Sequence, residues 1–314
     1  MTLSRIAENA FWMGRYIERA DSFVQILSVT EAFASDLAEA EAWGPVLDVF
    51  ADRKEYEARK RPITAANVAK FYLTDRNNPS SAYSCVRATR ENARALRHLI
   101  STESWQSVSM FHDDMEALSR RRFAISALAA ICEHIRESCC LYRGVIDNTW
   151  YRDEAWLFNR IGAALESADQ TTRLLDMKYF QAKDPEDDDA APVADVAWWN
   201  TLLRTASGYH AFNRRYTFNP QPADAAAFLL HDLQFPRSVG GAATVAFACL
   251  KTLEKEFRAK PGPAVKEAVA AFSERLDAPP NRLAGRALHK YLDEIQQDII
   301  RLANALNERY FAPA

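Results

Sequence analysis

The fold of this chain is decided by its opening stretch, LSRIAENAFWMGRYIERADSFVQIL, which comprises residues 3–27. Apolar residues recur there at alternating spacings of three and four positions, the period of one face of an α-helix. The seam consists of Ile6, Ala10, Met13, Ile17, Ala20, Val24 and Leu27. Such a seam is typical of helices packed side by side in a bundle. The pattern predicts one long helix over residues 3–41, broken by Gly44-Pro45.

The composition extends this helical prediction to the whole chain. Only 9 of 314 residues are glycine, well below the roughly 7% of average proteins. Sheets use glycine in hairpin turns, whereas each glycine inside a helix costs about 1 kcal/mol relative to alanine. The 48% hydrophobic content is ordinary for a protein with a large core. We therefore predict an all-α fold, a mixed multi-helix bundle of about ten helices with two related halves.

Helical periodicity and turn signals divide the rest of the chain. Further helices are expected over residues 64–74, 81–100, 101–118, 121–149, 153–180, 196–216, 222–230, 238–258, 263–276 and 282–310. Residues 52–61 are charged and predict a connection or a short exposed helix. The acidic segment 183–195 lacks apolar anchors and predicts a solvated loop. This loop would separate an N-terminal half, 1–182, from a C-terminal half, 196–314, packed on the first.

An internal repeat relates the first long helix to the helix near residue 160. At an offset of 148 positions the identical pairs are Gly14 and Gly162, Glu18 and Glu166, Ala20 and Ala168, and Asp21 and Asp169. The apolar seam follows the same offset. The second copy has Ala163 and Ser167 where the first has Arg15 and Arg19. A two-fold symmetric arginine–glutamate site is therefore in doubt.

Charge and cysteine usage exclude several classes of function. A net charge of −3 gives no electrostatic basis for binding nucleic acid. No stretch approaches 18 consecutive apolar residues, so no membrane span is expected, and no secretory signal is visible. The five cysteines show no disulfide spacing. The sequence thus predicts a cytoplasmic protein without a metal or another cofactor, since its six scattered histidines form no metal-ligand motif.

The first candidate site is the charged face formed by Arg15, Glu18 and Arg19. Trp12 shares this face and other aromatic residues flank it, which indicates that the helix is buried nearly all round. Buried charges need partners, because an unpaired one is prohibitively costly. Three interpretations remain open: a buried structural network, a ligand-binding or catalytic site, and a plain solvated surface. In the second copy Glu166, Asp169 and Arg173 are the corresponding candidates.

A second candidate is a stripe of four arginines along one helix face, Arg87, Arg90, Arg94 and Arg97. Like charges at these spacings repel one another unless an anion lies against them. The stripe is expected to pair with Glu18, Glu166 or Asp169, to bind an anionic ligand or partner, or to face solvent. A third candidate is Arg237-Ser238, either an ordinary capped turn or an anion-binding loop.

Several segments together resemble the bacterial alpha-E family, which is named for a helical Glu-Arg motif. The resemblance is carried by residues 3–20, 78–81, 88–94, 165–175, 228–230 and 235–238, and so covers most of the chain. It implies association with circularly permuted ATP-grasp amide ligases and transglutaminase-like peptidases, and a part in peptide synthesis or modification.

The leading hypothesis is an accessory or binding component of an amide-ligation system, which uses an Arg/Glu-lined cleft between helices. One alternative is a stand-alone enzyme with Glu18 or Glu166 as general acid or base on an anionic, peptide-like substrate. Another is a structural module that forms homo-oligomers through the long apolar seam.

Overall fold

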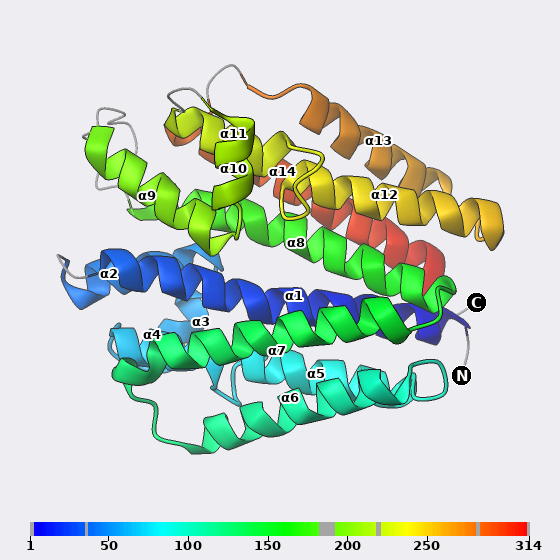
Figure 1. Cartoon of the computed structure of the whole chain (residues 1–314), viewed down its shortest axis with the longest axis horizontal. Helices are drawn as coiled ribbons and strands as arrows, with labels where there is room; N and C mark the ends of the chain where they lie inside the picture. The colour runs from blue at the N-terminus through cyan, green and yellow to red at the C-terminus, as the bar shows by residue number, and fades with distance from the viewer. Residues whose placement is uncertain (1–2, 35–36, 182–191, 218–220, 281–282, 313–314) are drawn as a thin grey trace.

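A computed structural model describes residues 3–34, 37–181, 192–217, 221–280 and 283–312. Over these ranges the chain forms 14 α-helices and no strand (Figure 1). The predicted all-α bundle is confirmed. The helices outnumber the roughly ten expected because α2 and the short α3 are additional helices and the helix expected over 196–216 is divided.

The N-terminal part of the chain contributes seven α-helices to the described residues. They are α1 (Leu3–Phe33), α2 (Glu39–Val49), α3 (Arg53–Ala58), α4 (Ala65–Leu73), α5 (Ala82–Ala95), α6 (Thr102–Arg120) and α7 (Leu128–Thr149). The remaining helices are α8 (Glu154–Gln181), α9 (Pro192–Thr205), α10 (Tyr209–Arg215), α11 (Pro222–His231), α12 (Val239–Glu256), α13 (Pro263–Asp277) and α14 (Gly285–Leu306). A 3-10 turn, Ile125–Ala127, precedes α7, and a π-helical turn, Asn307–Phe311, follows α14.

The first helix is shorter than the sequence predicted. It ends at Phe33 rather than near residue 41, and Gly44 and Pro45 lie inside α2 instead of breaking a helix. Proline inside a helix removes one backbone hydrogen bond. Trp43, Val46 and Leu47 of the same helix are almost fully buried, so their packing offsets that loss.

Three other predicted boundaries were wrong. The helix expected over 121–149 begins at Leu128, after the short 3-10 turn. The helix expected over 196–216 is divided into α9 and α10 by Ser207, whose positive φ of 58° is incompatible with a continuing helix. Residues 192–195 belong to α9 rather than to the acidic loop, and residues 183–191 of that loop lie outside the described residues.

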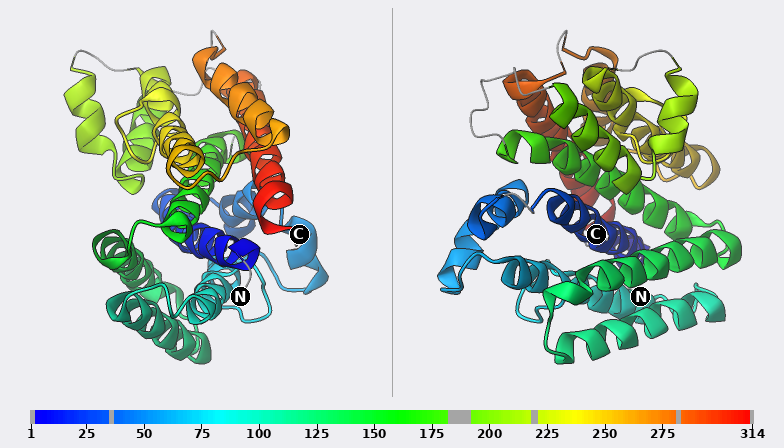
Figure 2. Two further views of the ribbon diagram at one scale, coloured as in Figure 1. Left: turned by 90° about the vertical axis from the view of Figure 1, so that its right-hand side faces the viewer. Right: turned by 60° about the vertical axis from the view of Figure 1, so that its left-hand side comes forward.

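The two copies of the repeat form the centre of the bundle. Helix α8 packs along α1, and it also contacts α12 and α14 (Figures 1 and 2). Helices α5 and α7 pack against α1. The seam residues Met13, Ile17, Val24 and Leu27 are buried in this centre. The apolar seam of α1 therefore packs against other helices of the same chain.

A glycine from each copy allows α1 and α8 to approach closely. A Cβ atom on Gly14 would lie 2.2 Å from the carbonyl oxygen of Asn159, and one on Gly162 would lie 2.0 Å from that of Phe11. Neither distance is sterically possible, so only glycine fits at these two positions. Asn159 also donates a hydrogen bond from Nδ2 to the Ala10 carbonyl oxygen at 3.0 Å. The acidic residues of both copies are thereby held near the crossing.

None of the described helices combines enough length with enough apolar character to cross a lipid bilayer.

Candidate binding site

Glu166 of the second copy lies at the buried centre of an ion-pair network. Its side chain is 0% exposed. Arg15 donates from Nε at 2.6 Å, and Arg19 donates from Nε at 2.6 Å and from Nη2 at 3.1 Å. Burial alone would raise the pKa of the Glu166 carboxyl, but the two guanidinium groups hold that pKa well below its ordinary value. Glu166 is thus an ionised residue that ties α1 to α8, and it is unsuited to proton transfer near neutral pH.

Glu18 occupies the equivalent position of the first copy but has very different surroundings. The α8 positions that correspond to Arg15 and Arg19 are Ala163 and Ser167, which cannot neutralise it. Among the described residues, its ion-pair partner is Arg143 of α7, whose Nη1 atom lies at 3.3 Å. Burial raises the pKa of the Glu18 carboxyl, although Arg143 and Arg237 oppose that shift. The negative charge of the Glu18 carboxylate is therefore only weakly neutralised by neighbouring residues.

Asp21 is paired with two arginines from outside α8, since α8 has no arginine at the positions equivalent to Arg15 and Arg19. Arg237, from the loop between α11 and α12, donates from Nη2 to Asp21 Oδ2 at 2.6 Å, and Arg143 donates to the same oxygen at 2.8 Å. Burial would raise the pKa of Asp21, but these two guanidinium groups hold it below its ordinary value. Asp21 is 1% exposed, and its Oδ1 atom has no hydrogen-bond partner in the part of the chain that the structure describes.

A pocket of about 210 Å³ opens beside Glu18, where Ala163 and Ser167 leave space. We name it the Glu18 pocket, and its lining consists of Glu18, Arg143, Arg160, Ala163, Ala164, Ser167, Pro236, Arg237, Ala242 and Val245. Three guanidinium groups and one carboxylate thus line the pocket, while Asp21 and Asp147, the ion-pair partners of these arginines, lie outside the lining. The pocket is suited to an anionic group, because guanidinium binds carboxylate and phosphate through paired hydrogen bonds.

Arg160 is the arginine of this pocket with the weakest internal attachment. Its partner is Asp147, at 3.3 Å, and both side chains are partly exposed. Such an exposed pair contributes about 0–1 kcal/mol. Its guanidinium group is therefore available to a ligand at little cost to folding.

The two residues of the Arg237-Ser238 turn have different roles. Ser238 caps α12 by accepting a hydrogen bond from the Gly241 backbone N–H at 2.8 Å. It is fully buried and also donates to the Phe235 carbonyl oxygen at 2.9 Å. Ser238 therefore positions the loop, and Arg237 carries the charge into the Glu18 pocket.

Asp169 and Arg173 lie with Arg19 at a different pocket. Arg173 donates from Nε to Asp169 Oδ2 at 2.9 Å and from Nη1 to the Val49 carbonyl oxygen at 2.7 Å. Asp169 is therefore paired with an arginine of its own helix, whereas the equivalent Asp21 is paired with arginines from α7 and a loop.

The arginine stripe is not brought to these carboxylates. Arg87 and Arg94 are exposed on α5, and Arg97 is exposed in the turn that follows this helix; Arg94 pairs with Glu91 of α5 at 2.5 Å. The guanidinium groups of Arg90 and Arg97 lie against the Trp105 ring. Among the described residues, the hydrogen bonds and ion pairs of Glu18, Glu166 and Asp169 involve none of the four stripe arginines.

The sequence reasoning missed Arg143 and Arg160. Arg143 stands between Tyr142 and Ile146, which are buried positions of α7. A charge so near a buried helical face was the available signal, but only the tertiary packing shows which carboxylate it meets.

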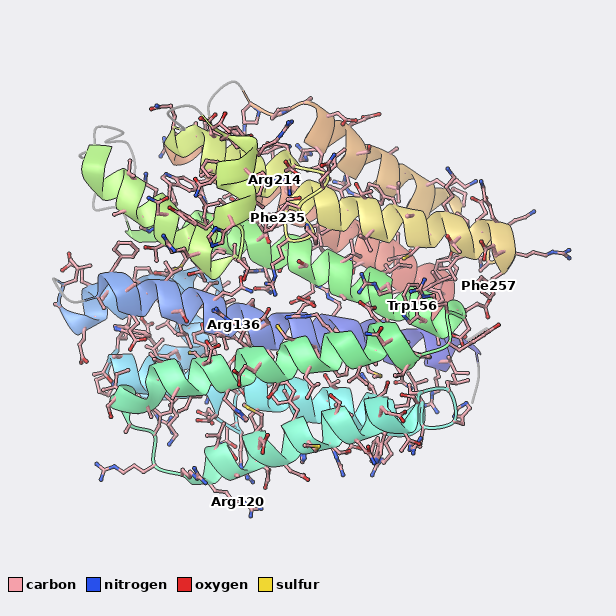
Figure 3. The ribbon with its side chains drawn as sticks, viewed as in Figure 1. Arg120, Arg136, Trp156, Arg214, Phe235 and Phe257 are labelled. Atoms are coloured by element: carbon pink, nitrogen blue, oxygen red, sulfur yellow. The ribbon has the colours of Figure 1, made fainter. Side chains whose placement is uncertain are left out.

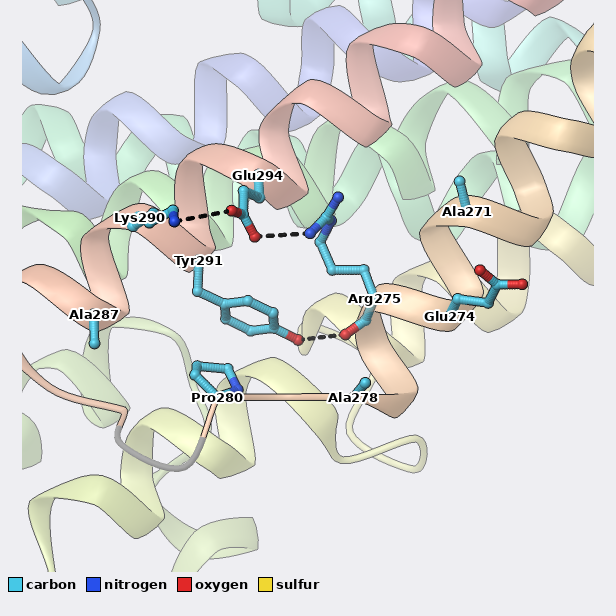
Figure 4. A pocket seen from close by; sticks show the side chains of 9 residues that line it. All are labelled: Ala271, Glu274, Arg275, Ala278, Pro280, Ala287, Lys290, Tyr291 and Glu294. Carbon is cyan, nitrogen blue, oxygen red and sulfur yellow. Dashed lines mark hydrogen bonds and ion pairs between the residues drawn. The ribbon is translucent and has the colours of Figure 1, made fainter.

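Two other features of the described residues are explained by internal pairing. The pocket between α13 and α14 has a volume of about 530 Å³, and in it Arg275 pairs with Glu294 at 2.7 Å (Figure 4). In the side-chain view of the whole chain, helices α13 and α14 lie on one side of α8, and α1 and α7 lie on the opposite side (Figure 3). His289 has a ligand-like grouping with Asp176 and Asp293, but each ring nitrogen already faces a different carboxylate, at 2.8 and 3.6 Å.

The cysteine thiols near the crossing are not activated nucleophiles. Burial raises the pKa of Cys85 to about 12 and that of Cys139 well above its ordinary value. A thiol with a raised pKa is inert near neutral pH.

Residues 2–311 match the model of a family named Alpha-E, described as "a predicted alpha-helical domain with a conserved ER motif". Similar curated proteins are uncharacterised proteins of Mycobacterium bovis and Mycobacterium tuberculosis, each 24% identical over 258 residues. The match covers 75% of this chain but only 28% of each relative, so the relatives are much longer. No solved structure matches.

Proposed function

This chain belongs to the Alpha-E family, and from that premise we propose that it is a binding component that holds an anionic group of a peptide-like ligand in the Glu18 pocket. The observation that carries the proposal is the difference between the two copies of the motif. Glu166 is neutralised by Arg15 and Arg19, whereas Glu18 faces an open pocket whose lining contains three arginines and no other carboxylate among the described residues.

A carboxylate of a small peptide suits the dimensions of this pocket. A volume of about 210 Å³ corresponds to about seven water molecules, enough for a terminal residue or an acidic side chain. Arg160 and Arg237 provide guanidinium groups from two different segments of the chain. Arg143 bonds both Asp21 and Glu18 and therefore positions Glu18, whereas the printed bond of Arg237 uses Nη2 on Asp21 and leaves its other N–H groups for the ligand.

The arrangement supports binding better than catalysis. Glu166 is locked as an ionised ion-pair partner, and the nearby thiols have raised pKa values. Glu18, whose pKa is raised, is the single acid that lines the pocket. If the chain were an enzyme of its own, Glu18 would be its general acid, which is the second candidate function.

The partner in this proposal is a circularly permuted ATP-grasp ligase, with a transglutaminase-like peptidase in the same system. The support is the family, together with the much greater length of the curated relatives, which carry additional sequence besides the matched part. The proposed setting is the cytoplasm. Oligomerisation through the seam of α1 has no support, because that seam is buried within the chain.

Calorimetric titration with N-acetylglycine tests the binding site, since this probe carries a carboxylate and no free amine. We expect Arg160→Gln to weaken binding about 10-fold or more, as the loss of a charge-assisted pair implies. Arg152→Gln is the matched control. Both arginines stack on Trp156, at 5.2 and 5.9 Å, but only Arg160 lines the pocket. Equal affinities for the two variants would contradict the assignment.

Size-exclusion chromatography with a circularly permuted ATP-grasp ligase from the same genome tests the partnership. A shared peak is expected, and separate peaks at micromolar concentrations would refute that part of the proposal. Turnover of a peptide by the isolated chain that Glu18→Gln removes, without a change in Tm, would instead favour the enzyme.

A further inference from the structure

A second pocket lies on the Arg19 side of the motif, and the proposed function does not use it. Its volume is about 190 Å³. We name it the Arg19 pocket, and it is lined by Arg19, Phe23, Phe50, Asp52, Ser80, Asp169, Gln170 and Arg173. These residues come from α1, α8, the turn between α2 and α3, and the turn before α5. The pocket is thus assembled from four separate parts of the chain.

Two guanidinium groups in this pocket retain free donors. Arg19 uses Nε and Nη2 on Glu166, and Arg173 uses Nε on Asp169 and Nη1 on the Val49 carbonyl oxygen. A guanidinium group has five N–H donors. Within the described residues, Nη1 of Arg19 and Nη2 of Arg173 therefore remain available to a carboxylate.

The same pocket also presents acceptors without donors. Gln170 is 8% exposed, and none of the described residues donates a hydrogen bond to its Oε1 atom. Its Nε2 atom donates to Glu166 at 2.8 Å. Because a carboxylate only accepts hydrogen bonds, this contact fixes which end of the amide is oxygen. A buried orphan acceptor is costly, and a donor from a ligand would satisfy it.

Asp52 adds a carboxylate to this acceptor side. Burial raises the pKa of Asp52, while Tyr72, Arg173 and Arg19 oppose the shift and Glu55 adds to it. A carboxyl group with a raised pKa is one that a cationic ligand group would stabilise in its ionised form.

The charges around the Arg19 pocket cancel. Its lining contains two arginines, Arg19 and Arg173, and two carboxylates, Asp52 and Asp169. A simple anion would leave the lining negative and a simple cation would leave it positive. The lining of the Glu18 pocket, in contrast, contains three arginines and one carboxylate. Balanced charge with both donors and acceptors unsatisfied is complementary to a molecule that carries one group of each sign.

We propose that the Arg19 pocket binds a free α-amino acid. Its carboxylate accepts hydrogen bonds from Arg19 and Arg173, and its ammonium group donates to Asp52 and Gln170 Oε1. Phe23 and Phe50, whose ring centroids are 4.9 Å apart, form an apolar wall for a small side chain. The volume, equivalent to about six water molecules, limits the ligand to a small amino acid.

A panel of the twenty standard amino acids, screened by thermal shift and then by calorimetry on the whole chain, tests this site. We expect at least one small amino acid to bind with a millimolar or lower Kd. Its two halves, acetate and methylammonium, should each bind at least 10-fold more weakly. Absence of binding by every amino acid at 10 mM overturns the proposal, as does acetate that binds as well as the amino acid.

Variants separate this site from the Glu18 pocket. Asp52→Asn should weaken amino-acid binding at least 10-fold, whereas Glu57→Gln, on the exposed side of α3, should leave it unchanged. Arg160→Gln should also leave it unchanged, because Arg160 lines only the other pocket. If Asp52→Asn is folded, as judged by its Tm, and binds the amino acid as tightly as the wild type does, the assignment is overturned, even if N-acetylglycine binding persists.

Discussion

Glu18 and Glu166 occupy equivalent positions of two helices that cross closely, yet only Glu166 is fully neutralised. Two guanidinium groups meet Glu166 at 2.6 Å, while the closest one to Glu18 lies at 3.3 Å. The difference follows from Ala163 and Ser167, which stand on α8 where α1 has Arg15 and Arg19. One half of the motif therefore holds the fold together, and the other half borders a pocket.

Neutralising the two glutamates should have unequal effects on stability. Glu166→Gln leaves the partly buried Arg15 and Arg19 without their counter-ion, so we expect a loss of about 3 kcal/mol in the free energy of unfolding, the lower end of the range for a broken buried pair. Glu18→Gln should cost less than about 1 kcal/mol, because burial raises the pKa of Glu18 and its ionised form therefore contributes little stability. Urea denaturation followed by circular dichroism measures both. Similar losses for the two variants would contradict the asymmetry.

The crossing glycines should tolerate no side chain. In Gly14→Ala and Gly162→Ala the new Cβ atom would lie 2.2 or 2.0 Å from a backbone oxygen of the other helix. Each variant should therefore lose at least about 2–3 kcal/mol, the upper range for overpacking, or fail to fold. Gly144→Ala is the control, since nothing lies within 4 Å of that site. On an exposed helix this change should stabilise by about 0.5–1 kcal/mol. Thermal unfolding of all three tests the close approach.

The helical architecture could be predicted because it depends on local signals. The seam from Ile6 to Leu27 and the turn signals between the helices depend on neighbouring residues, and the scarcity of glycine reflects helix propensity residue by residue. The boundaries that were wrong depended on tertiary packing. Pro45 remains inside a helix because its neighbours Trp43 and Leu47 are buried, which the local sequence does not reveal.

The candidate site was predictable only in part. The motif located Arg15, Glu18 and Arg19, and the offset of 148 residues located Glu166 and Asp169. The arginines that complete the Glu18 pocket come from α7, α8 and a loop, and their spacing carries no signal of convergence. The arginine stripe on α5 had the more regular pattern, yet Arg94 is 68% exposed. Regular spacing on one helix does not indicate what packs against it.

Anion binding at the Glu18 pocket should strengthen as the pH falls. A bound carboxylate repels ionised Glu18, so the protonated form of Glu18, which burial already favours, is the form that binds best. The groups that face Glu18 are Arg143, Arg237, Arg160 and Asp21, and the arginines stay charged throughout. Titration with N-acetylglycine between pH 5 and pH 8 should show this trend in the wild type. In Glu18→Gln the affinity should be nearly independent of pH, and an unchanged pH dependence there would refute the role of Glu18.

Acid should destabilise the chain through Glu166 and Asp21. Both have folded-state pKa values below their ordinary values of 4.5 and 3.8. The unfolded state therefore binds more protons once the pH falls below these ordinary values. The stability that the two carboxylates contribute is complete above about pH 5 and is lost as the pH falls further. With two groups involved, the free energy of unfolding should decrease by up to about 2.7 kcal/mol per pH unit.

Urea denaturation at pH 3–6 measures this slope. Glu166→Gln should reduce it by about half, whereas Glu91→Gln, on the exposed face of α5, should leave it nearly unchanged. A wild-type slope no steeper than that of Glu166→Gln would show that Glu166 is not held ionised by Arg15 and Arg19.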